Sequence, residues 1–191
     1  MRLLKLEKGF APLILVFFGA LLIIGLLFLA VIGRSILVTS PTALQDYAHG
    51  YRPFKITGHS MDPNFKDGQD WLSAPYISTQ PQRGDAVIFI NPQNQAQKFD
   101  KRIIGLPGDK VMVKGGLVYI NDQRLEEPYL APNTVTQAGN LPAEGQAVTI
   151  PSNNYYLLGD NRPFSSDSRN LGFIPRQSIL YKLVYCYLNC H

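Results

Sequence analysis

The sequence predicts an all-β domain, of the barrel or sandwich type, carried on one N-terminal transmembrane helix. A single long apolar segment lies near the N-terminus, and the rest of the chain consists of short apolar runs separated by turn residues. No stretch after residue 40 keeps an apolar period of 3.6 residues, which excludes long amphipathic helices. Short strands between frequent turns are typical of antiparallel barrels and sandwiches. We therefore expect an anchor at 1–34 and a β-rich domain at 35–191.

The composition is that of a folded protein. Of the 191 residues, 46% are hydrophobic and 17% are charged, which excludes a mainly disordered chain. The formal net charge of +4 is small, and there is no long basic run. Nucleic acid is therefore not an expected partner, whereas a mild attraction to anionic lipid headgroups would account for the sign of the charge.

The apolar segment at 9–33 contains no charged residue and predicts a membrane anchor. A helix of this length extends roughly 37 Å, while the hydrocarbon core of a bilayer is about 30 Å thick. Arg2, Lys5 and Lys8 precede the segment, so the positive-inside rule predicts a cytoplasmic N-terminus and an extracytoplasmic remainder. The segment is too long for a cleavable secretory signal and no small-x-small site follows it, so we interpret it as a retained anchor in contact with the lipid bilayer.

The candidate strands are short runs rich in Val, Ile, Tyr and Phe. They are residues 86–90, 98–104, 110–113, 117–120, 147–150, 155–158 and 180–187. Residues 110–120 predict a hairpin, because Gly115 and Gly116 can supply positive φ at its turn. Residues 35–55 are expected to form a connector with a short strand or helical turn. Residues 123–146, rich in Pro, Gly, Asn and Gln, are either an excursion from the sheet or an insertion.

Ser60 is the first candidate catalytic residue. It lies in the segment Gly-His-Ser-Met-Asp-Pro at 58–63, where Gly58 and Pro63 restrict the path of the chain. A serine held in this way can present its hydroxyl at a fixed angle, as a nucleophile must. Most serines in such turns only bond neighbouring backbone groups, so the hypothesis needs a base elsewhere in the chain.

Lysine is the better candidate for that base. His59 adjoins the serine, but neighbours in extended chain point to opposite faces, and the other two histidines lie in the connector and at the C-terminus. A lysine base must be neutral, and only about four lysines in ten thousand are neutral at pH 7 unless burial lowers the pKa. Lys101 fits this requirement, because alternation within 98–104 places it between Phe99 and Ile103 on one face. A lysine that snorkels at a sheet edge would show the same pattern.

A third polar cluster, at 159–172, follows the predicted strand 155–158 directly. Its charges alternate in sign along the chain and could lock the loop by charge-assisted hydrogen bonds. These charged residues are Asp160, Arg162, Asp167 and Arg169. The cluster also holds three serines whose hydroxyls could orient an amine. A solvated loop would have a similar composition.

The cysteines, Cys186 and Cys190, are too few for a disulfide framework or an ordinary zinc site. With His191 they could bind a metal adventitiously. A disulfide across a helical i, i+4 pair and two free thiols are both better interpretations, and the sequence leaves the choice between them open.

Taken together, these segments resemble the type I signal peptidases, membrane-bound Ser-Lys proteases that remove signal peptides from exported preproteins. The resemblance rests on four segments in the family's order behind an anchor with a cytoplasmic N-terminus. They are Gly-His-Ser-Met-Asp-Pro at 58–63, Arg-Gly-Asp-Ala-Val at 83–87, Lys-Arg-Ile-Ile-Gly-Leu-Pro-Gly-Asp at 101–109, and the Gly-Asp-Asn to Ser-Arg stretch at 159–169.

The resemblance implies roles for individual residues. Ser60 would be the nucleophile, Lys101 the general base, and Ser165 the serine whose hydroxyl orients that lysine. Asp160, Asp167 and Arg169 would brace the site. Cleavage would follow small side chains, with no metal or other cofactor. The enzyme would be a monomer in a bacterial plasma membrane, its catalytic domain would be extracytoplasmic, and its partners would be preprotein signal peptides.

Two positions depart from the family pattern. Gly58 replaces the Ser or Thr whose hydroxyl helps many relatives to stabilise the oxyanion, and Asn64 replaces a Thr. The second oxyanion donor is therefore open, with a backbone group or water as the expected replacement. One alternative function is a specialised maturation protease of a conjugation or pilus system in the same family. Another is a catalytically silent, membrane-anchored peptide-binding domain, which the intact Ser60, Lys101 and Ser165 argue against.

Overall fold

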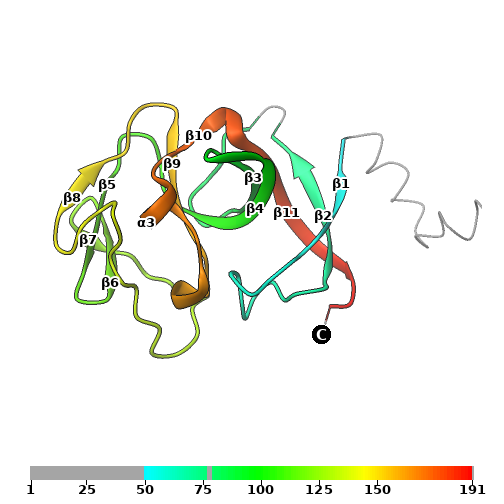
Figure 1. The fold of residues 1–191 in the computed structure, drawn as a ribbon, viewed down its shortest axis with the longest axis horizontal. Coiled ribbons are helices and arrows are strands. Elements are labelled where there is room, and N and C mark those ends of the chain that lie inside the picture. Colours follow the sequence, from blue (N-terminus) through cyan, green and yellow to red (C-terminus); the bar gives the residue numbers. More distant parts are fainter. Residues whose placement is uncertain (1–49, 77–78, 191) are drawn as a thin grey trace, which may run out of the picture. The chain divides into compact units, whose positions relative to one another are not determined.

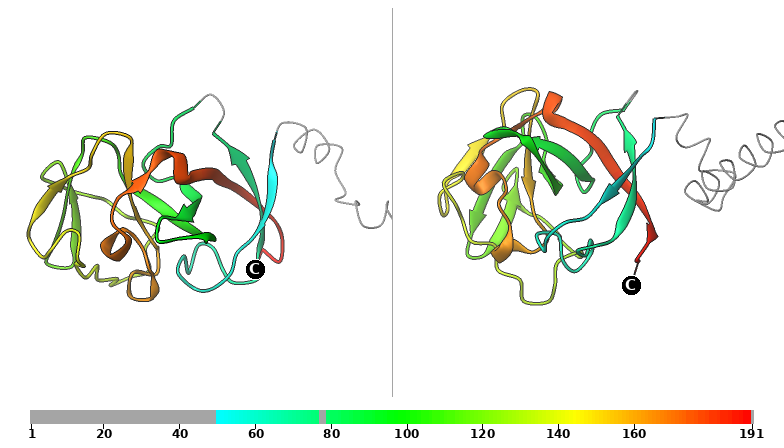
Figure 2. Two further views of the ribbon diagram at one scale, coloured as in Figure 1. Left: turned by 45° about the horizontal axis from the view of Figure 1, so that its top comes forward. Right: turned by 45° about the vertical axis from the view of Figure 1, so that its right-hand side comes forward.

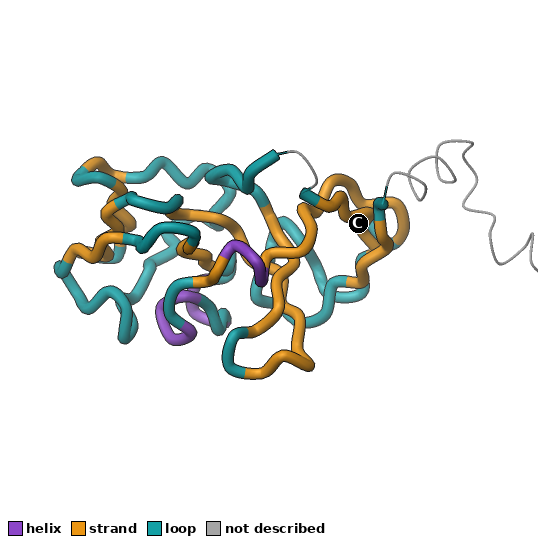
Figure 3. Tube along the Cα trace, turned by 90° about the horizontal axis from the view of Figure 1, so that it is seen from above, coloured by secondary structure: helices purple, strands orange, loops and turns teal. Residues whose placement is uncertain are grey.

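The computed structural model shown in Figure 1 describes residues 50–76 and 79–190. The predicted anchor at 9–33 and most of the connector at 35–55 lie outside the described residues. In the part of the chain that is described, no helix is long and apolar enough to cross a bilayer. Helical structure there is confined to the single turn α3 (Ser168–Leu171) and two 3-10 turns, η1 (Arg162–Phe164) and η2 (Arg176–Ser178), as Figure 3 shows.

The strands form two antiparallel sheets, as the sequence predicts. The larger sheet has the order β1-β2-β11-β3-β4-β9-β10 and the smaller has the order β7-β6-β5-β8. Their bounds are β1 Arg52–Lys55, β2 Asp70–Pro75, β3 Ala86–Asn91, β4 Asn94–Gly105, β5 Lys110–Lys114, β6 Leu117–Ile120, β7 Gln123–Arg124, β8 Ala147–Thr149, β9 Asn154–Leu158, β10 Ile174–Pro175 and β11 Ile179–Leu188. The smaller sheet lies at one end of this domain and β1 and β2 at the other, with β3 and β4 between them (Figures 1 and 2).

Every strand predicted from the sequence is present, as β3, β4, β5, β6, β8, β9 and β11. β4 begins at Asn94, earlier than predicted, because its first residue already pairs with Asn91 of β3. The predicted hairpin is β5–β6, with Gly115 (φ 58°) and Gly116 (φ 79°) at its turn. The connector ends in a strand, β1. The sequence did not predict β2, whose composition is not strongly apolar; it forms because both its edges pair, with β1 and with β11.

Alternation along β4 divides the core between its two faces. Ile103 belongs to a buried cluster with Phe89 of β3 and Leu157 of β9. Ile104 belongs to a second buried cluster, which includes Val111 of β5 and other apolar residues of the smaller sheet. β4 therefore contributes to both clusters, as β9 also does, so neighbouring side chains of β4 enter different surroundings.

Residues 125–146 leave the smaller sheet after β7 and return to it at β8. Leu125, Tyr129 and Ala138 pack against the core cluster of that sheet. The backbone N–H of Thr136 also donates to the carbonyl oxygen of Gly116, at 2.9 Å, in the β5–β6 turn. The excursion is thereby held close to the smaller sheet along much of its length.

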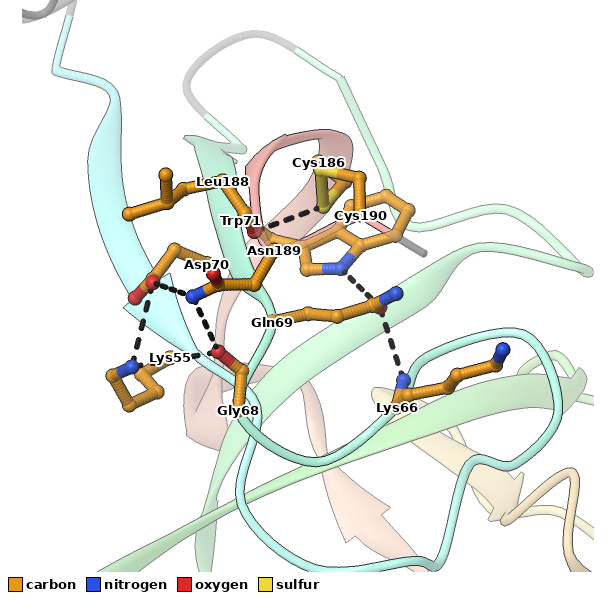
Figure 4. Close-up of a disulfide and its surroundings, with 10 residues drawn as sticks. All are labelled: Lys55, Lys66, Gly68, Gln69, Asp70, Trp71, Cys186, Leu188, Asn189 and Cys190. Carbon is orange, nitrogen blue, oxygen red and sulfur yellow. Dashed lines mark hydrogen bonds and ion pairs between the residues drawn. A yellow bond between two sulfur atoms is a disulfide. The ribbon is translucent and has the colours of Figure 1, made fainter.

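Cys186 and Cys190 form a disulfide at the end of β11, so the expectation of a helical pair was wrong. Cys186 is in extended chain, and a bend at Asn189 (φ 58°) brings the Cα atoms of the cysteines to 5.8 Å. The Asn189 side-chain nitrogen then lies 3.3 Å from the carbonyl oxygen of Gly68 and 3.4 Å from a carboxylate oxygen of Asp70 (Figure 4). The C-terminal end of the strand thus contacts the start of β2.

Candidate active site

The segment at 56–69, here called the Ser60 loop, is closed at its base by backbone hydrogen bonds. Ile56 N donates to Gln69 O at 2.8 Å, and Gly68 N donates to Ile56 O at 3.0 Å. Met61 is 1% exposed and belongs to the buried cluster that joins the loop to β3 and β11. Because the residue after Ser60 is anchored in the core, the serine occupies a fixed turn.

The structure brings Ser60 and Lys101 into direct contact. Lys101 Nζ lies 2.7 Å from Ser60 Oγ and also donates to the carbonyl oxygen of Asp100, at 2.7 Å. Lys101 is only 3% exposed, and its Nζ lies 5.3 Å from the ring centroid of Phe99. The side chain is therefore buried in β4 and does not snorkel at a sheet edge.

Burial lowers the pKa of the Lys101 amine. The negative charges of Asp100, Asp167 and Asp160 oppose this shift but do not cancel it. Both hydrogen bonds that the amine makes to described residues go to neutral oxygens. A neutral amine at hydrogen-bonding distance from a serine hydroxyl can accept the hydroxyl proton, which is the geometric requirement for a general base.

The neighbouring residue Arg102 points to the other face of β4 and is paired with a carboxylate. Its Nε lies 2.8 Å from Asp160 Oδ1 and its Nη2 lies 2.5 Å from Asp160 Oδ2. Asn64 of the Ser60 loop donates to the same carboxylate at 2.8 Å. Asp160 therefore joins the Ser60 loop to β4.

Asp167 and Arg169 form a second buried ion pair. Arg169 Nε lies 2.8 Å from Asp167 Oδ1, and Gly159 N donates to Asp167 Oδ2 at 3.0 Å. Burial by itself would lower the pKa of the Arg169 guanidinium, but the hydrogen bond to Asp167 and its charge raise this pKa. This pair fixes the polar loop where it leaves β9.

Gly159 permits that loop to approach Ser60 closely. A Cβ atom at this position would collide with Ser165 Oγ and with the carbonyl oxygen of Ser60. The next residues strengthen the contact, since Asn161 N donates to Ser60 O at 3.0 Å and Asn161 Nδ2 donates to His59 O at 2.9 Å. The three segments identified in the sequence therefore meet at Ser60.

Ser165 lies close to the backbone of Ser60 beside Gly159, and its hydroxyl makes no hydrogen bond to Lys101. Its Oγ is buried and has no hydrogen-bond partner among the described residues, while the Lys101 amine bonds Ser60 and the Asp100 carbonyl. His59, the rejected base, has a side chain that is 70% exposed and contacts Asp62 at 3.1 Å.

The backbone N–H of Gly58 is already used and cannot serve as the second oxyanion donor. Its N–H donates to Asp67 Oδ1 at 2.7 Å. Its φ of 85° lies in the left-handed region that favours glycine, so a Ser or Thr at this position would strain the backbone. The loop is thus built for glycine here.

Sequence reasoning missed a buried ion pair between Arg162 and Glu127. Arg162 is 1% exposed; its guanidinium contacts both carboxylate oxygens of Glu127 and also Thr136 Oγ1. The sequence placed Arg162 in the polar cluster, whereas Glu127 lies in the segment interpreted as an excursion from the sheet or an insertion. Only the isolated Glu126-Glu127 pair in a Pro- and Gly-rich stretch could have signalled a buried partner.

A serine hydroxyl in contact with a buried lysine amine, in an antiparallel β domain, is the arrangement of a serine endopeptidase of the Ser-Lys kind. The comparison with protein families agrees, because the family described as signal peptidase, peptidase S26, matches residues 13–188. The chain belongs to this family of serine endopeptidases.

Several relatives carry the same family name. Signal peptidase I U of Bacillus subtilis (strain 168) is 40% identical over 124 residues, which cover 63% of this chain and 66% of that relative. Signal peptidase I of Bacillus licheniformis is 35% identical over 153 residues, covering 76% of this chain and 81% of the relative. Signal peptidase IB of Staphylococcus aureus (strain COL) is 36% identical over 146 residues, covering 70% and 75%. A crystal structure of a signal peptidase I from Enterococcus faecalis V583 matches with a TM-score of 0.45 and 33% identity, over 56% of this chain and 98% of that chain.

Proposed function

We propose that this chain removes signal peptides from exported preproteins, with Ser60 as the nucleophile and Lys101 as the general base. The observation that carries the proposal is the 2.7 Å contact between Ser60 Oγ and the amine of Lys101, a residue that is 3% exposed. Among the described residues, no carboxylate is hydrogen-bonded to this amine. Relatives named signal peptidase I and IB support the choice of substrate.

The reaction is an acyl transfer in two stages. Ser60 Oγ attacks the carbonyl carbon of the scissile bond while its proton passes to Lys101 Nζ. Collapse of the tetrahedral intermediate expels the new amino terminus, which takes that proton and leaves an ester on Ser60. Lys101 then removes a proton from water, which attacks the ester carbonyl. Collapse of this second tetrahedral intermediate breaks the bond to Ser60 Oγ, which takes the proton back from Lys101, and the signal peptide leaves as a carboxylate.

The tetrahedral intermediate needs donors for its oxyanion. One such donor is worth roughly 2.7–4 kcal/mol of transition-state stabilisation. Because the N–H of Gly58 is already bonded to Asp67 and the residue has no hydroxyl, the second donor is a different backbone group or water.

Ser165 and the two ion pairs serve the geometry of this reaction. The unpaired Ser165 Oγ is available to the Lys101 amine when the amine leaves the Asp100 carbonyl, which supports an orienting role. Asp160 holds β4 to the Ser60 loop, and Asp167 with Arg169 holds the loop that touches Ser60.

The location proposed for the enzyme is a bacterial plasma membrane. The predicted anchor at 9–33 would leave the N-terminus cytoplasmic and the β domain, within 35–191, extracytoplasmic. The disulfide at the end of β11 supports this side of the membrane, because disulfides persist in oxidising compartments. The domain is proposed to act as a monomer.

Cleavage of a model preprotein by the full chain in detergent or lipid vesicles tests the proposal. Ser60→Ala and Lys101→Ala should each lower kcat by about a thousandfold or more, the order seen when one member of a catalytic unit is removed. Ser152→Ala, in an exposed turn, and Lys114→Ala, at the exposed end of β5, are matched controls and should leave the rate unchanged.

Near-normal cleavage by Lys101→Ala would show that the dyad assignment is wrong. Failure of the wild-type chain on ordinary preproteins, with cleavage of a narrow substrate, would identify the specialised maturation protease. If the wild-type chain cleaves no substrate at all, the result would favour the catalytically silent peptide-binding domain.

A further inference from the structure

Tyr129 lies where three segments that surround Ser60 come together. Its carbonyl oxygen accepts a hydrogen bond, at 2.7 Å, from the Asn64 side chain of the Ser60 loop. Its ring faces the guanidinium of Arg102 on β4, with the guanidinium carbon 4.2 Å from the ring centroid. The backbone and ring of one residue thus contact both the serine's loop and the lysine's strand.

The Tyr129 hydroxyl extends the contacts to the third segment. It donates to Glu127 Oε1 at 2.7 Å, and Glu127 is paired with Arg162. Arg162 Nε in turn donates to the carbonyl oxygen of Gly159, at 3.1 Å, beside Ser60. Burial raises the pKa of the Tyr129 hydroxyl, which favours its neutral, donating form.

Ser60 and Lys101 are far apart in the sequence and lie on different elements, so their separation depends on how those elements are joined. The Asp160 carboxylate joins them on one side, through Asn64 and Arg102. Tyr129 touches the same two side chains from the excursion after β7. Its ring also packs against the core of the smaller sheet, which gives the contact a rigid support.

We propose that Tyr129 is a positioning residue that fixes the Ser60 loop against β4 and so sets the distance between Ser60 Oγ and Lys101 Nζ. The proposal rests on the roles assigned to Ser60 and Lys101 above. It gives the excursion at 125–146 a part in the reaction, although none of its described side chains is hydrogen-bonded to Ser60 or Lys101.

Kinetics of the full chain with a model preprotein test this role. Tyr129→Ala removes the ring and hydroxyl, and should lower kcat by about 10- to 100-fold, because a misplacement of about 1 Å can cost about a hundredfold. KM should stay within about twofold, since no substrate-binding group is removed. Tyr129→Phe keeps the ring on Arg102 and the carbonyl on Asn64, so it should retain kcat within about threefold.

The pH profile separates positioning from proton transfer. In Tyr129→Ala the plateau of kcat/KM should fall while the midpoint of its acid limb stays where it is in the wild type, because Lys101 remains the titrating group. A merely structural role would lower the melting temperature and leave kcat unchanged at temperatures well below melting.

Tyr76→Ala is the matched control. Tyr76 has the same pattern of contacts, with Arg176 5.4 Å from its ring centroid and its hydroxyl 2.7 Å from Asp85 Oδ2. It also packs against a core cluster, but that cluster contains no residue of the Ser60 loop. Its loss should lower the melting temperature and keep kcat within about twofold of the wild type.

Equal kcat values for Tyr129→Ala and Tyr76→Ala would overturn the proposal. If Tyr129→Ala does not fold, Asn64→Ala is measured in its place, because it removes the side chain that bonds both the Tyr129 carbonyl and Asp160. An unchanged kcat in Asn64→Ala would also overturn the proposal. Failure of the proposed function has a different signature, namely that the Ser60→Ala variant still cleaves.

Discussion

Lys101 and Arg102 are adjacent cations on β4 whose surroundings differ completely. Lys101 lies among apolar groups on one face, hydrogen-bonded to a hydroxyl and a carbonyl. Arg102 lies on the other face, where two of its nitrogens contact the buried carboxylate of Asp160. Both side chains are mostly covered, so burial alone does not distinguish them.

The difference is the presence of a counter-charge. A buried cation without a carboxylate is destabilised in its charged form, which is why the pKa of Lys101 falls. A buried guanidinium that bonds both oxygens of a carboxylate acts as a rigid link. One face of the strand therefore suits proton transfer and the other suits the support of the site.

The largest expected effect on kcat comes from replacing each of the two cations by the other kind. Lys101→Arg keeps a positive charge but cannot accept a proton, so kcat should fall about a thousandfold or more, as in Lys101→Ala. Arg102→Lys keeps the charge but loses the bidentate contact with Asp160, and should cost only about tenfold. Rates with a model preprotein measure both.

Circular dichroism should show both variants folded at the assay temperature. A Lys101→Arg enzyme that keeps more than about a tenth of the wild-type rate would argue against proton transfer by Lys101, since an arginine is charged at any accessible pH.

The next largest expected effect is the dependence of the cleavage rate on pH. Because the pKa of Lys101 is lowered, the neutral amine becomes abundant at lower pH than for an exposed lysine. The rate should rise about tenfold per pH unit below that pKa and level off above it. A profile that is flat from about pH 6 to 10 would contradict a titrating lysine base.

The free energy of unfolding should also depend on the protonation of Lys101. The unfolded chain binds a proton at Lys101 up to its ordinary pKa and the folded chain gives it up earlier, so this residue makes the unfolding free energy rise with pH between the two values. Burial raises the pKa of Asp100, so its contribution is present at low pH and is lost as the pH rises through its folded-state pKa. The two residues thus affect the unfolding free energy over different pH ranges and with opposite sign. The pH profile of activity therefore reports on Lys101 more directly than stability does.

The sequence predicted one face of β4 better than the other. Strand alternation at 98–104 was enough to place Lys101 between Phe99 and Ile103, because a strand's period is two wherever it lies. It could not predict that Asn64 would bridge to Asp160, since that contact joins loops far apart in the chain. The pairing of Arg162 with Glu127 was hidden for the same reason, as loop contacts follow no period.

The smallest expected effect on kcat comes from removing the disulfide. Cys186 and Cys190 are four positions apart, and the entropy of closing so short a loop is worth about 2 kcal/mol. The Ser60 loop is touched from this end by Asn189, whose long hydrogen bond reaches Gly68 at the base of the loop. A double substitution to serine should therefore lower the unfolding free energy by about 2 kcal/mol in denaturant titrations and change kcat less than about twofold. Reductant should have the same effect on the wild type and none on the double variant. A tenfold loss of kcat would instead mean that this end of β11 positions Ser60 as strongly as the ion pairs beside β4.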